Sequence, residues 1–316
     1  MFEKLTKKSP YPVFECKEED IGWYKKIGEG ISSVYKVEWA NKEYAGKLYE
    51  KFREDDILYE LNIAKKLENT EQSVKVYGII LYDNNLLILM ELLTSFGDLY
   101  DYIQKKQKWK ATYLIDGEYV PNPKTEYIYF NKDDNIYWNY ILSDKQKMKI
   151  TLSLAKAIRE LHKNNIIHGD IKTNNVVLHY EPKKEYIKLI DFGVSYTTNT
   201  EDLIEIECRC GTLGYRAPEQ EDLKMNYKSD IYSMAVTIVE LWNGDIWYDG
   251  NNFKECRKEV LRGIRNIEKN NLEIGRLIRK SINLKHKNRP DSKGFLESIK
   301  KIISNNGHKY RKNLHN

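Results

Sequence analysis

The chain has 316 residues with a net charge of +5 at pH 7, which suits one large domain or two lobes. The positive charge is too mild and too widely spread to predict nucleic-acid binding, and no run of about 18 apolar residues predicts a membrane span. Four scattered cysteines are too few for a disulfide framework, which favours a reducing, cytoplasmic compartment.

The N-terminal part of the chain predicts a polar extension followed by strands. Residues 1–20 are polar and contain two prolines, so we expect an extension that lies on a lobe or stays loose. Residues 23–27 are strand-like, and Gly28 and Gly30 then form a G-x-G pattern before a second strand-like run. Such a turn lets a backbone approach phosphates closely, although a G-x-G alone is more often a simple tight turn.

A lysine and a helix follow the glycine turn. Lys47 lies in the strand-like residues 44–48, and residues 54–67 predict a helix. Its inward face is marked by apolar side chains at helical spacing, namely Ile57, Leu61 and Ala64.

The next residues predict a hairpin and then an unusual insertion. Residues 74–82 and 86–90 are apolar strands separated by an Asp-Asn-Asn turn. Residues 105–142 are rich in aromatic side chains and include a further hairpin pattern at 113–120 around Asp-Gly. The insertion is either a partner surface or a segment that packs on the rest of the chain.

Residues 168–175 carry the groups on which we base a chemical prediction. A capping-box pattern at Ser143 opens a predicted helix that ends near residue 163, just before this stretch. Asp170, Lys172 and Asn175 follow, and Asp191 comes 16 residues after Asn175. One carboxylate can orient a hydroxyl, an ammonium can neutralise a phosphoryl group, and the remaining oxygens can bind magnesium. The pattern therefore predicts phosphoryl transfer.

These motifs, taken in order, resemble those of protein kinases. The stretch 168–175 reads H-x-D-x-K-x-x-N, residues 191–193 read D-F-G, and residues 211–219 look like the end of an activation segment. The resemblance implies the two-lobed α+β kinase fold, with an antiparallel-sheet small lobe containing one main helix and a mostly helical large lobe. Its implied parts are an extension at 1–20, a kinase domain at 21–304 (small lobe 21–92, large lobe 93–304, insertion 105–142) and a basic tail at 305–316.

The resemblance also implies a magnesium–ATP site and assigns its residues. Asp170 and Lys172 are the catalytic pair, and Asn175 and Asp191 bind the metal. Lys47 needs a carboxylate partner, for which Glu60 is the first choice and Glu54 the alternative. The ATP-binding set is Ile27, Gly28, Gly30, Val34, Ala45, Lys47, Glu60, Met90, Glu91, Leu93, Asp98 and Val177.

Several further roles come from the same resemblance. Adenine binds the hinge backbone after Met90, so the side chains there should matter little, and Asp98 can reach the ribose or a basic substrate residue. Asp230 is expected to tie down the backbone of the catalytic loop. Arg289 is expected to pair with Glu219, the last residue of the activation segment.

Two positions depart from the family pattern. Ser33 stands where the third loop glycine is usual, and Gly169 stands where most members have Arg before the catalytic Asp. That Arg receives a phosphorylated residue of the activation segment, so its absence predicts activity without phosphate on Thr197, Thr198 or Thr200.

Lys172 and Thr212 match serine/threonine-specific members, so we expect a protein substrate phosphorylated on serine or threonine. Two alternatives belong to other classes. One is a pseudokinase scaffold, for which Ser33 and Gly169 are the arguments, although Lys47, Asp170, Asn175 and Asp191 are all present. The other is a small-molecule phosphotransferase, against which the residues 211–219 argue. A metal site at Cys208-x-Cys210 is disfavoured because no second Cys or His pair accompanies it.

Overall fold

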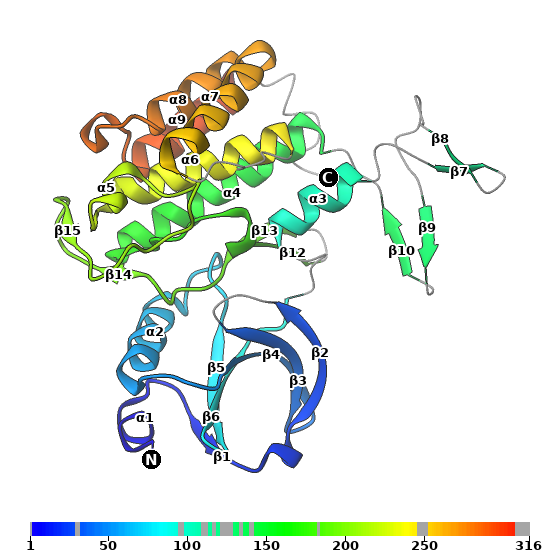
Figure 1. Cartoon of the computed structure of the whole chain (residues 1–316), viewed down its shortest axis with the longest axis vertical. Coiled ribbons are helices and arrows are strands. Elements are labelled where there is room, and N and C mark those ends of the chain that lie inside the picture. Colours follow the sequence, from blue (N-terminus) through cyan, green and yellow to red (C-terminus); the bar gives the residue numbers. More distant parts are fainter. Residues whose placement is uncertain are drawn as a thin grey trace.

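The chain folds into two lobes, one built on a sheet and the other on helices (Figure 1). The structure is a computed structural model, and it describes residues 2–28, 32–93, 98–108, 113–115, 118–120, 129–132, 135–138, 142–181, 184–244 and 252–306. Gly30, one of the predicted ATP-binding residues, lies outside these described residues, as does the basic tail beyond residue 306. The predicted two-lobed α+β arrangement, with a sheet in the small lobe and helices in the large lobe, is confirmed.

The small lobe is a six-stranded sheet with a helix against it. Neighbouring strands are antiparallel as predicted, except that the first strand runs parallel to its neighbour. That one parallel pair corrects the expectation of a purely antiparallel sheet. The strands, in spatial order, are β1 (Val13–Glu15), β5 (Val76–Tyr82), β6 (Asn85–Met90), β4 (Lys42–Tyr49), β3 (Ser33–Trp39) and β2 (Gly22–Gly28).

The N-terminal residues lie on the small lobe. Strand β1 adds to its sheet edge, and helix α1 (Glu3–Lys8) places Leu5 fully inside an apolar cluster. The Leu5 backbone N–H also donates to the carboxylate of Glu54 at 2.9 Å. Residues 2–20 are therefore folded against the lobe that the sequence predicted to begin at residue 21.

Helix α2 (Glu54–Leu67) has the bounds that the sequence predicts. Three acidic residues in its first turn and two lysines in its last turn complement the helix dipole. Its apolar face covers the sheet through Ile57, Leu61 and Ala64, all of which are buried.

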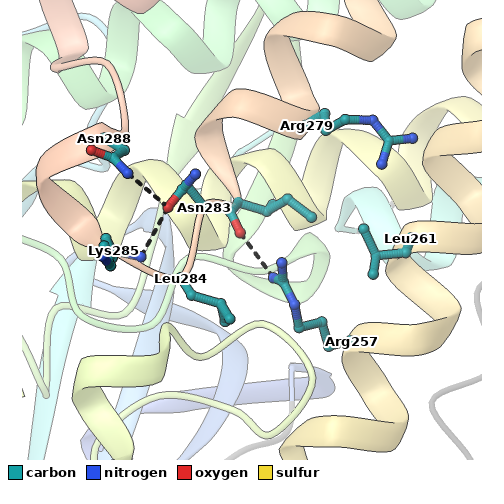
Figure 2. A pocket seen from close by; sticks show the side chains of 8 residues that line it. Arg257, Leu261, Arg279, Asn283, Leu284, Lys285 and Asn288 are labelled. Carbon is teal, nitrogen blue, oxygen red and sulfur yellow. Dashed lines mark hydrogen bonds between the residues drawn. The ribbon is translucent and has the colours of Figure 1, made fainter.

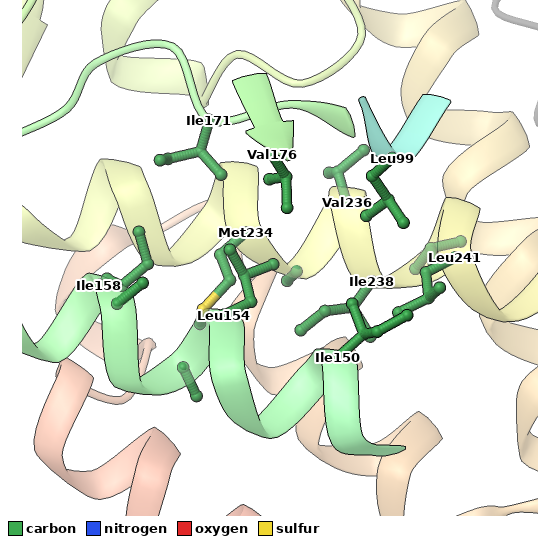
Figure 3. Packing of buried hydrophobic residues seen from close by; sticks show 14 of the residues in the cluster. Leu99, Ile150, Leu154, Ile158, Ile171, Val176, Met234, Val236, Ile238 and Leu241 are labelled. Carbon is green, nitrogen blue, oxygen red and sulfur yellow. The ribbon is translucent and has the colours of Figure 1, made fainter. Parts of the chain in front are cut away.

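The large lobe is organised around helices α4 (Asp144–Lys163) and α6 (Tyr227–Asn243). Ser143 caps α4 through the predicted capping box with Gln146. Figure 3 shows apolar side chains of α4 and α6 packed against Ile171 and Val176, which flank the predicted catalytic residues. The other helices are α3 (Leu99–Lys108), α5 (Pro218–Glu221), α7 (Phe253–Asn270), α8 (Leu272–Ser281) and α9 (Ser292–Asn305).

Short strands and turns complete this lobe. Four pairs are antiparallel hairpins or short ladders: β7 (Tyr113–Ile115) with β8 (Glu118–Val120), β9 (Tyr129–Lys132) with β10 (Asn135–Trp138), β12 (Val176–Glu181) with β13 (Lys184–Leu189), and β15 (Ile204–Glu205) with β16 (Lys224–Met225). A further pair joins β11 (Ile166–Ile167) to β14 (Tyr196–Thr197). The hairpin predicted at 113–120 is thus present. None of the described helices is both long and apolar enough to cross a bilayer.

A buried ion pair joins α5 to the loop before α9. Arg289 donates to both carboxylate oxygens of Glu219, at 2.7 and 2.8 Å, and both residues are buried. Burial raises the pKa of Glu219, but hydrogen bonding to Arg289 outweighs this effect and leaves that pKa below its usual value.

Replacing Arg289 by Ala should destabilise the fold strongly, because it leaves the Glu219 carboxylate buried without its cation. The expected loss in the free energy of unfolding is about 3–5 kcal/mol. Denaturant unfolding of Arg289→Ala should be compared with Arg279→Ala, which breaks an exposed bidentate pair with Glu268. That control should lose at most about 1 kcal/mol. Equal losses in the two variants would contradict a structural role for the buried pair.

Candidate active site

The Lys47 side chain connects the two lobes. Its ammonium lies 2.8 Å from Glu60 Oε1 on α2 and 3.1 Å from Asp191 Oδ1 in the large lobe. Tyr49 donates its hydroxyl to the second oxygen of Glu60 at 2.6 Å. The structure thus pairs Lys47 with Glu60, while the alternative partner, Glu54, is bound by α1.

The charges of this triad are set by burial and by one another. Burial alone would lower the pKa of Lys47, but the carboxylates of Glu60 and Asp191 outweigh it and raise that pKa well above its ordinary value. Burial acts to raise the pKa of Asp191, and the attraction of Lys47 overcomes it, so that this pKa is lowered. Both groups are therefore ionised at neutral pH.

The D-F-G residues are turned so that the carboxylate faces the triad and the ring faces the core. Phe192 is buried in the main apolar cluster, with its ring centroid 5.1 Å from that of His168. Asp191 has a φ of +64°, a left-handed conformation that costs energy in a residue other than glycine. This turn keeps the side chain of Asp191 42% exposed and directed at Lys47.

In the predicted catalytic loop, Asp170 and Lys172 both bind Thr212 of the activation segment, and Asn175 binds Asp170. Asp170 Oδ1 accepts from both the backbone N–H (2.7 Å) and the hydroxyl (2.8 Å) of Thr212. Lys172 lies 2.9 Å from Asp170 Oδ2 and donates to the Thr212 hydroxyl at 2.7 Å. Asn175 donates to Asp170 through Nδ2, at 2.8 Å to the carbonyl and 3.2 Å to the carboxylate.

Asp230 binds the backbone of the predicted catalytic loop, as the sequence analysis expects. Its buried carboxylate accepts the backbone N–H groups of His168 at 2.9 Å and Gly169 at 3.0 Å. His162 on α4 lies 3.0 Å from the same carboxylate through Nε2. The helix-start Asp thus serves the loop, whereas Asn226 caps α6.

A second buried carboxylate was not anticipated from the sequence. Glu240 on α6 accepts from the hydroxyl of Thr173 at 3.0 Å and from the hydroxyl of Tyr215. It joins the catalytic loop to the activation segment. The sequence does hold an indication of this contact, because Glu240 lies in an otherwise apolar helix and a buried charge needs polar partners.

Metal binding can be tested against the chemistry of the residues present. Asn175 uses its amide nitrogen toward Asp170, which leaves its oxygen as the atom that can bind a cation. Asp191 supplies an ionised, part-exposed carboxylate. Among the described residues, no three or more His, Cys, Asp or Glu side chains lie close enough together to hold a metal ion by themselves, and none join Cys208 and Cys210 in such a group. Two protein oxygens suit Mg²⁺, which usually keeps waters and substrate phosphates as its other ligands.

The expected adenine region is formed by strands of the small lobe and by β12. Ala45 lies opposite Met90 in the β4–β6 register, and Val34 lies opposite Lys47 in β3–β4. Ala45 and Val177 are buried, and Leu93 is half-buried. At the other edge of the sheet, Gly28 pairs with Val34, and Ile27 is exposed.

In the hinge, the Glu91 side chain makes a contact that the sequence does not indicate. Glu91 forms an ion pair with Lys188 of β13, whose side chain is only 2% exposed. Lys188 also lies 3.4 Å from the carbonyl of Ser73, and the Glu91 backbone N–H donates to Lys75 at 2.8 Å. Glu91 therefore fixes the hinge to the large lobe, and the expectation that adenine uses the hinge backbone and not its side chains stays a prediction.

Asp98 is engaged within the large lobe. Its Oδ2 accepts from Asn174 at 3.1 Å, and its Oδ1 accepts the backbone N–H of Asp101 at the start of α3. It also forms an isolated bridge with Val177. The residue therefore lies beside the catalytic loop.

The threonines at 197 and 198 of the activation segment are held by uncharged contacts. The Thr197 N–H donates to the hydroxyl of Tyr59 on α2 at 2.9 Å, and the Thr198 N–H donates to the Asn165 carbonyl at 3.0 Å. Tyr227 donates to the Thr198 carbonyl. Tyr59 and Tyr227 were not identified from the sequence, because nothing local marks an aromatic side chain as a contact to a distant backbone.

Gly169 is required by the backbone at its position. It has a φ of +81°, and a Cβ built there would lie 2.7 Å from the carbonyl oxygen of Val194. A side chain at this position would thus be strained and crowded. Gly169 also accepts from the Gln220 amide at 3.0 Å, which ties the loop to α5.

The sequence matches the family model of the protein kinase domain over residues 23–309. Among curated relatives, a probable serine/threonine-protein kinase, gdt4, of Dictyostelium discoideum is 27% identical over 78% of this chain and 13% of its own length. Rust resistance kinase Lr10 of Triticum aestivum is 26% identical over 76% of this chain and 34% of its own length.

Probable serine/threonine-protein kinase 2 of Plasmodium falciparum is 25% identical over 80% of this chain and 43% of its own length. The chain thus spans less than half the length of each of these three relatives. The family model covers most of the chain, and the fold and the order of the motifs agree with it. The chain therefore belongs to the protein kinase family.

Proposed function

We propose that the chain is an ATP-dependent protein kinase that phosphorylates serine or threonine hydroxyls of protein substrates. The observation that carries this proposal is the assembled geometry. The Lys47–Glu60–Asp191 triad is complete, and Asp170, Lys172 and Asn175 form one hydrogen-bonded group. When bound, Mg²⁺–ATP supplies the phosphoryl group and the charge neutralisation that its transfer needs.

Each side chain has a separate role in this proposal. Lys47, held by Glu60, binds nucleotide phosphates, and Asn175 and Asp191 hold the metal. Asp170 accepts and orients the substrate hydroxyl through its carboxylate. Lys172 stands beside that carboxylate, where its charge stabilises negative charge developing on the phosphoryl oxygens.

Preference for serine or threonine rests on the Lys172–Thr212 contact. The ammonium and the hydroxyl are 2.7 Å apart, and both bind Asp170. Lys172 and Thr212, the two residues whose identities predict this specificity, thus contact each other beside Asp170. The relatives named as serine/threonine kinases support the same proposal.

The rival proposal is a pseudokinase scaffold, and the two make different demands on the site. A scaffold needs neither an ionised carboxylate at Asp191 nor an Asp170 carboxylate oriented by Thr212, so the presence of both supports the kinase proposal. For the aromatic-rich insertion at 105–142, packing on the large lobe stays the preferred prediction and a partner surface the alternative. A cytoplasmic location stays a prediction from cysteine usage.

Two variants test the chemistry. Asp191→Ala should abolish phosphoryl transfer, because it removes a metal ligand without opening a cavity in the core. Asp170→Asn should lower kcat by about 10²–10⁴-fold with little change in ATP affinity. Turnover can be followed with Mg²⁺–ATP and an arrayed peptide library, with Asp222→Asn, an exposed carboxylate, as the control. Wild-type turnover by Asp191→Ala would refute the proposed site.

Activity should not depend on phosphate in the activation segment. Thr197 and Thr198 are placed by backbone and hydroxyl contacts, and Gly169 offers no cation to a phosphate there. Phosphatase treatment, and separately a triple variant of Thr197, Thr198 and Thr200 to Ala, should each change peptide phosphorylation by at most about threefold. A cationic pocket for phosphate would be worth roughly 1.5–3 kcal/mol, or about 10–150-fold. A drop of about a hundredfold in both measurements would contradict the prediction.

A further inference from the structure

A pocket distant in sequence from the predicted catalytic residues lies between α7, α8 and the loop that follows α8. It measures about 460 Å³, and Figure 2 shows its lining side chains. Arg257 and Leu261 come from α7, Arg279 from α8, and Leu284 and Lys285 from the loop. We call it the α7–α8 pocket.

The pocket is cationic. Three of its lining residues are basic and none is acidic. Arg279 is neutralised by Glu268, to which it donates through Nε and Nη2 at 2.7 Å each. Arg257 and Lys285 have no carboxylate partner among the described residues. The pocket therefore presents two uncompensated cations.

The surroundings carry the same sign of charge. Residues 252–306 contain 15 Lys and Arg and 6 Asp and Glu, a net charge of +9, so the rest of the chain is at −4. Positive potential over α7–α9 attracts an anionic partner and repels a basic one.

An apolar side chain stands between the two cations. Leu284 is 54% exposed, the highest value among the exposed large hydrophobic side chains of the described residues. Leu261 lines the pocket from α7 and is half-buried. An exposed leucine flanked by Arg257 and Lys285 suits a ligand that is itself apolar at its centre and acidic at its flanks.

Hydrogen bonds to its backbone carbonyls hold the loop that forms the pocket wall in place. Arg289 donates to the carbonyl of Asn283 at 2.7 Å and approaches that of Leu284 at 3.4 Å. Arg257 donates through Nη1 to the Ile282 carbonyl at 2.8 Å, which leaves its other donors available. A preformed site loses less entropy on binding than a flexible one.

The same arginine connects the pocket to the activation segment. Arg289 holds Glu219, and Glu219 is seven residues from Thr212, which binds Asp170. A protein chain bound in the pocket would therefore contact a loop that is linked, through Arg289 and Glu219, to the segment that carries Thr212.

We propose that the α7–α8 pocket docks an acidic segment of a protein substrate, with an apolar residue on Leu284 and carboxylates toward Arg257 and Lys285. This inference rests on the proposed kinase function for its identification of the partner as a substrate. A nucleic acid is disfavoured, because two phosphate contacts give weak, strongly salt-dependent binding.

Binding can be measured without catalysis. The probe is a fluorescein-labelled peptide with glutamates flanking a pair of leucines, followed by anisotropy on the full chain. Lys285→Glu and Leu284→Ser should each weaken binding by at least about tenfold. Lys300→Glu, the same charge change at an exposed position on α9, should stay within about twofold. Both pocket residues are exposed, so thermal unfolding should be unchanged.

Matched probes separate the contributions and the alternatives. Replacing the leucines by serine, or the glutamates by lysine, should each abolish most of the binding. Loss of binding with these probes and with the pocket variants supports the proposal. Equal affinity of wild type, Leu284→Ser and Lys285→Glu overturns it. Tighter binding of a single-stranded RNA, lost in the same variants, also overturns it in favour of a polyanion surface.

A second readout links docking to turnover. A serine peptide fused to the acidic segment should have a KM at least about tenfold lower than the serine peptide alone, with kcat unchanged. Lys285→Glu should remove that difference and leave the short peptide unaffected. If no peptide is phosphorylated but the anisotropy results hold, the proposed function fails and the docking site stands. If the fused peptide has no advantage in an active enzyme, the partner is not a substrate and the proposal is overturned.

Discussion

The carboxylate of Asp230 is the constraint on which the geometry of the candidate active site depends. It accepts two consecutive backbone N–H groups, those of His168 and Gly169, and therefore fixes the two peptide units that lead into Gly169, the residue before Asp170. These bonds are charge-assisted and buried, so losing the acceptor would leave two unsatisfied donors in the core. Because α6 carries Asp230 and is packed against α4, the catalytic loop inherits the rigidity of the largest apolar cluster.

Features with a local signal could be predicted from the sequence. Helix α2 was predicted with its observed bounds because apolar spacing and flanking charges agree there, and α4 because Ser143 and Gln146 form a capping box. The candidate site residues could be named because their spacing follows known motifs, and the structure brings Lys47, Glu60 and Asp191 together. Gly30 lies outside the described residues.

Contacts that close long loops could not be predicted in this way. Glu91 and Lys188 are 97 residues apart, and Thr197 and Tyr59 are 138 residues apart. The two residues of each pair are not related by a helical or strand periodicity or by a turn, so they meet only when the two lobes pack together. The same holds for the parallel pairing of β1 with β5, since a short polar segment gives no indication of which sheet edge accepts it.

Two ion pairs between the lobes, Glu91–Lys188 and Lys47–Asp191, differ in a way that suits the proposed nucleotide site. Glu91–Lys188 has a fully buried cation and is reinforced by backbone bonds from Leu189 to Gln72 and Val74, so opening it would strand a charge. Lys47–Asp191 has a carboxylate that is 42% exposed, and each partner of that pair is assigned to a different part of the same ligand. The Glu91–Lys188 pair thus holds the two lobes together. Under the proposed function, nucleotide phosphate and metal would replace the Lys47–Asp191 contact without leaving either charge unpaired.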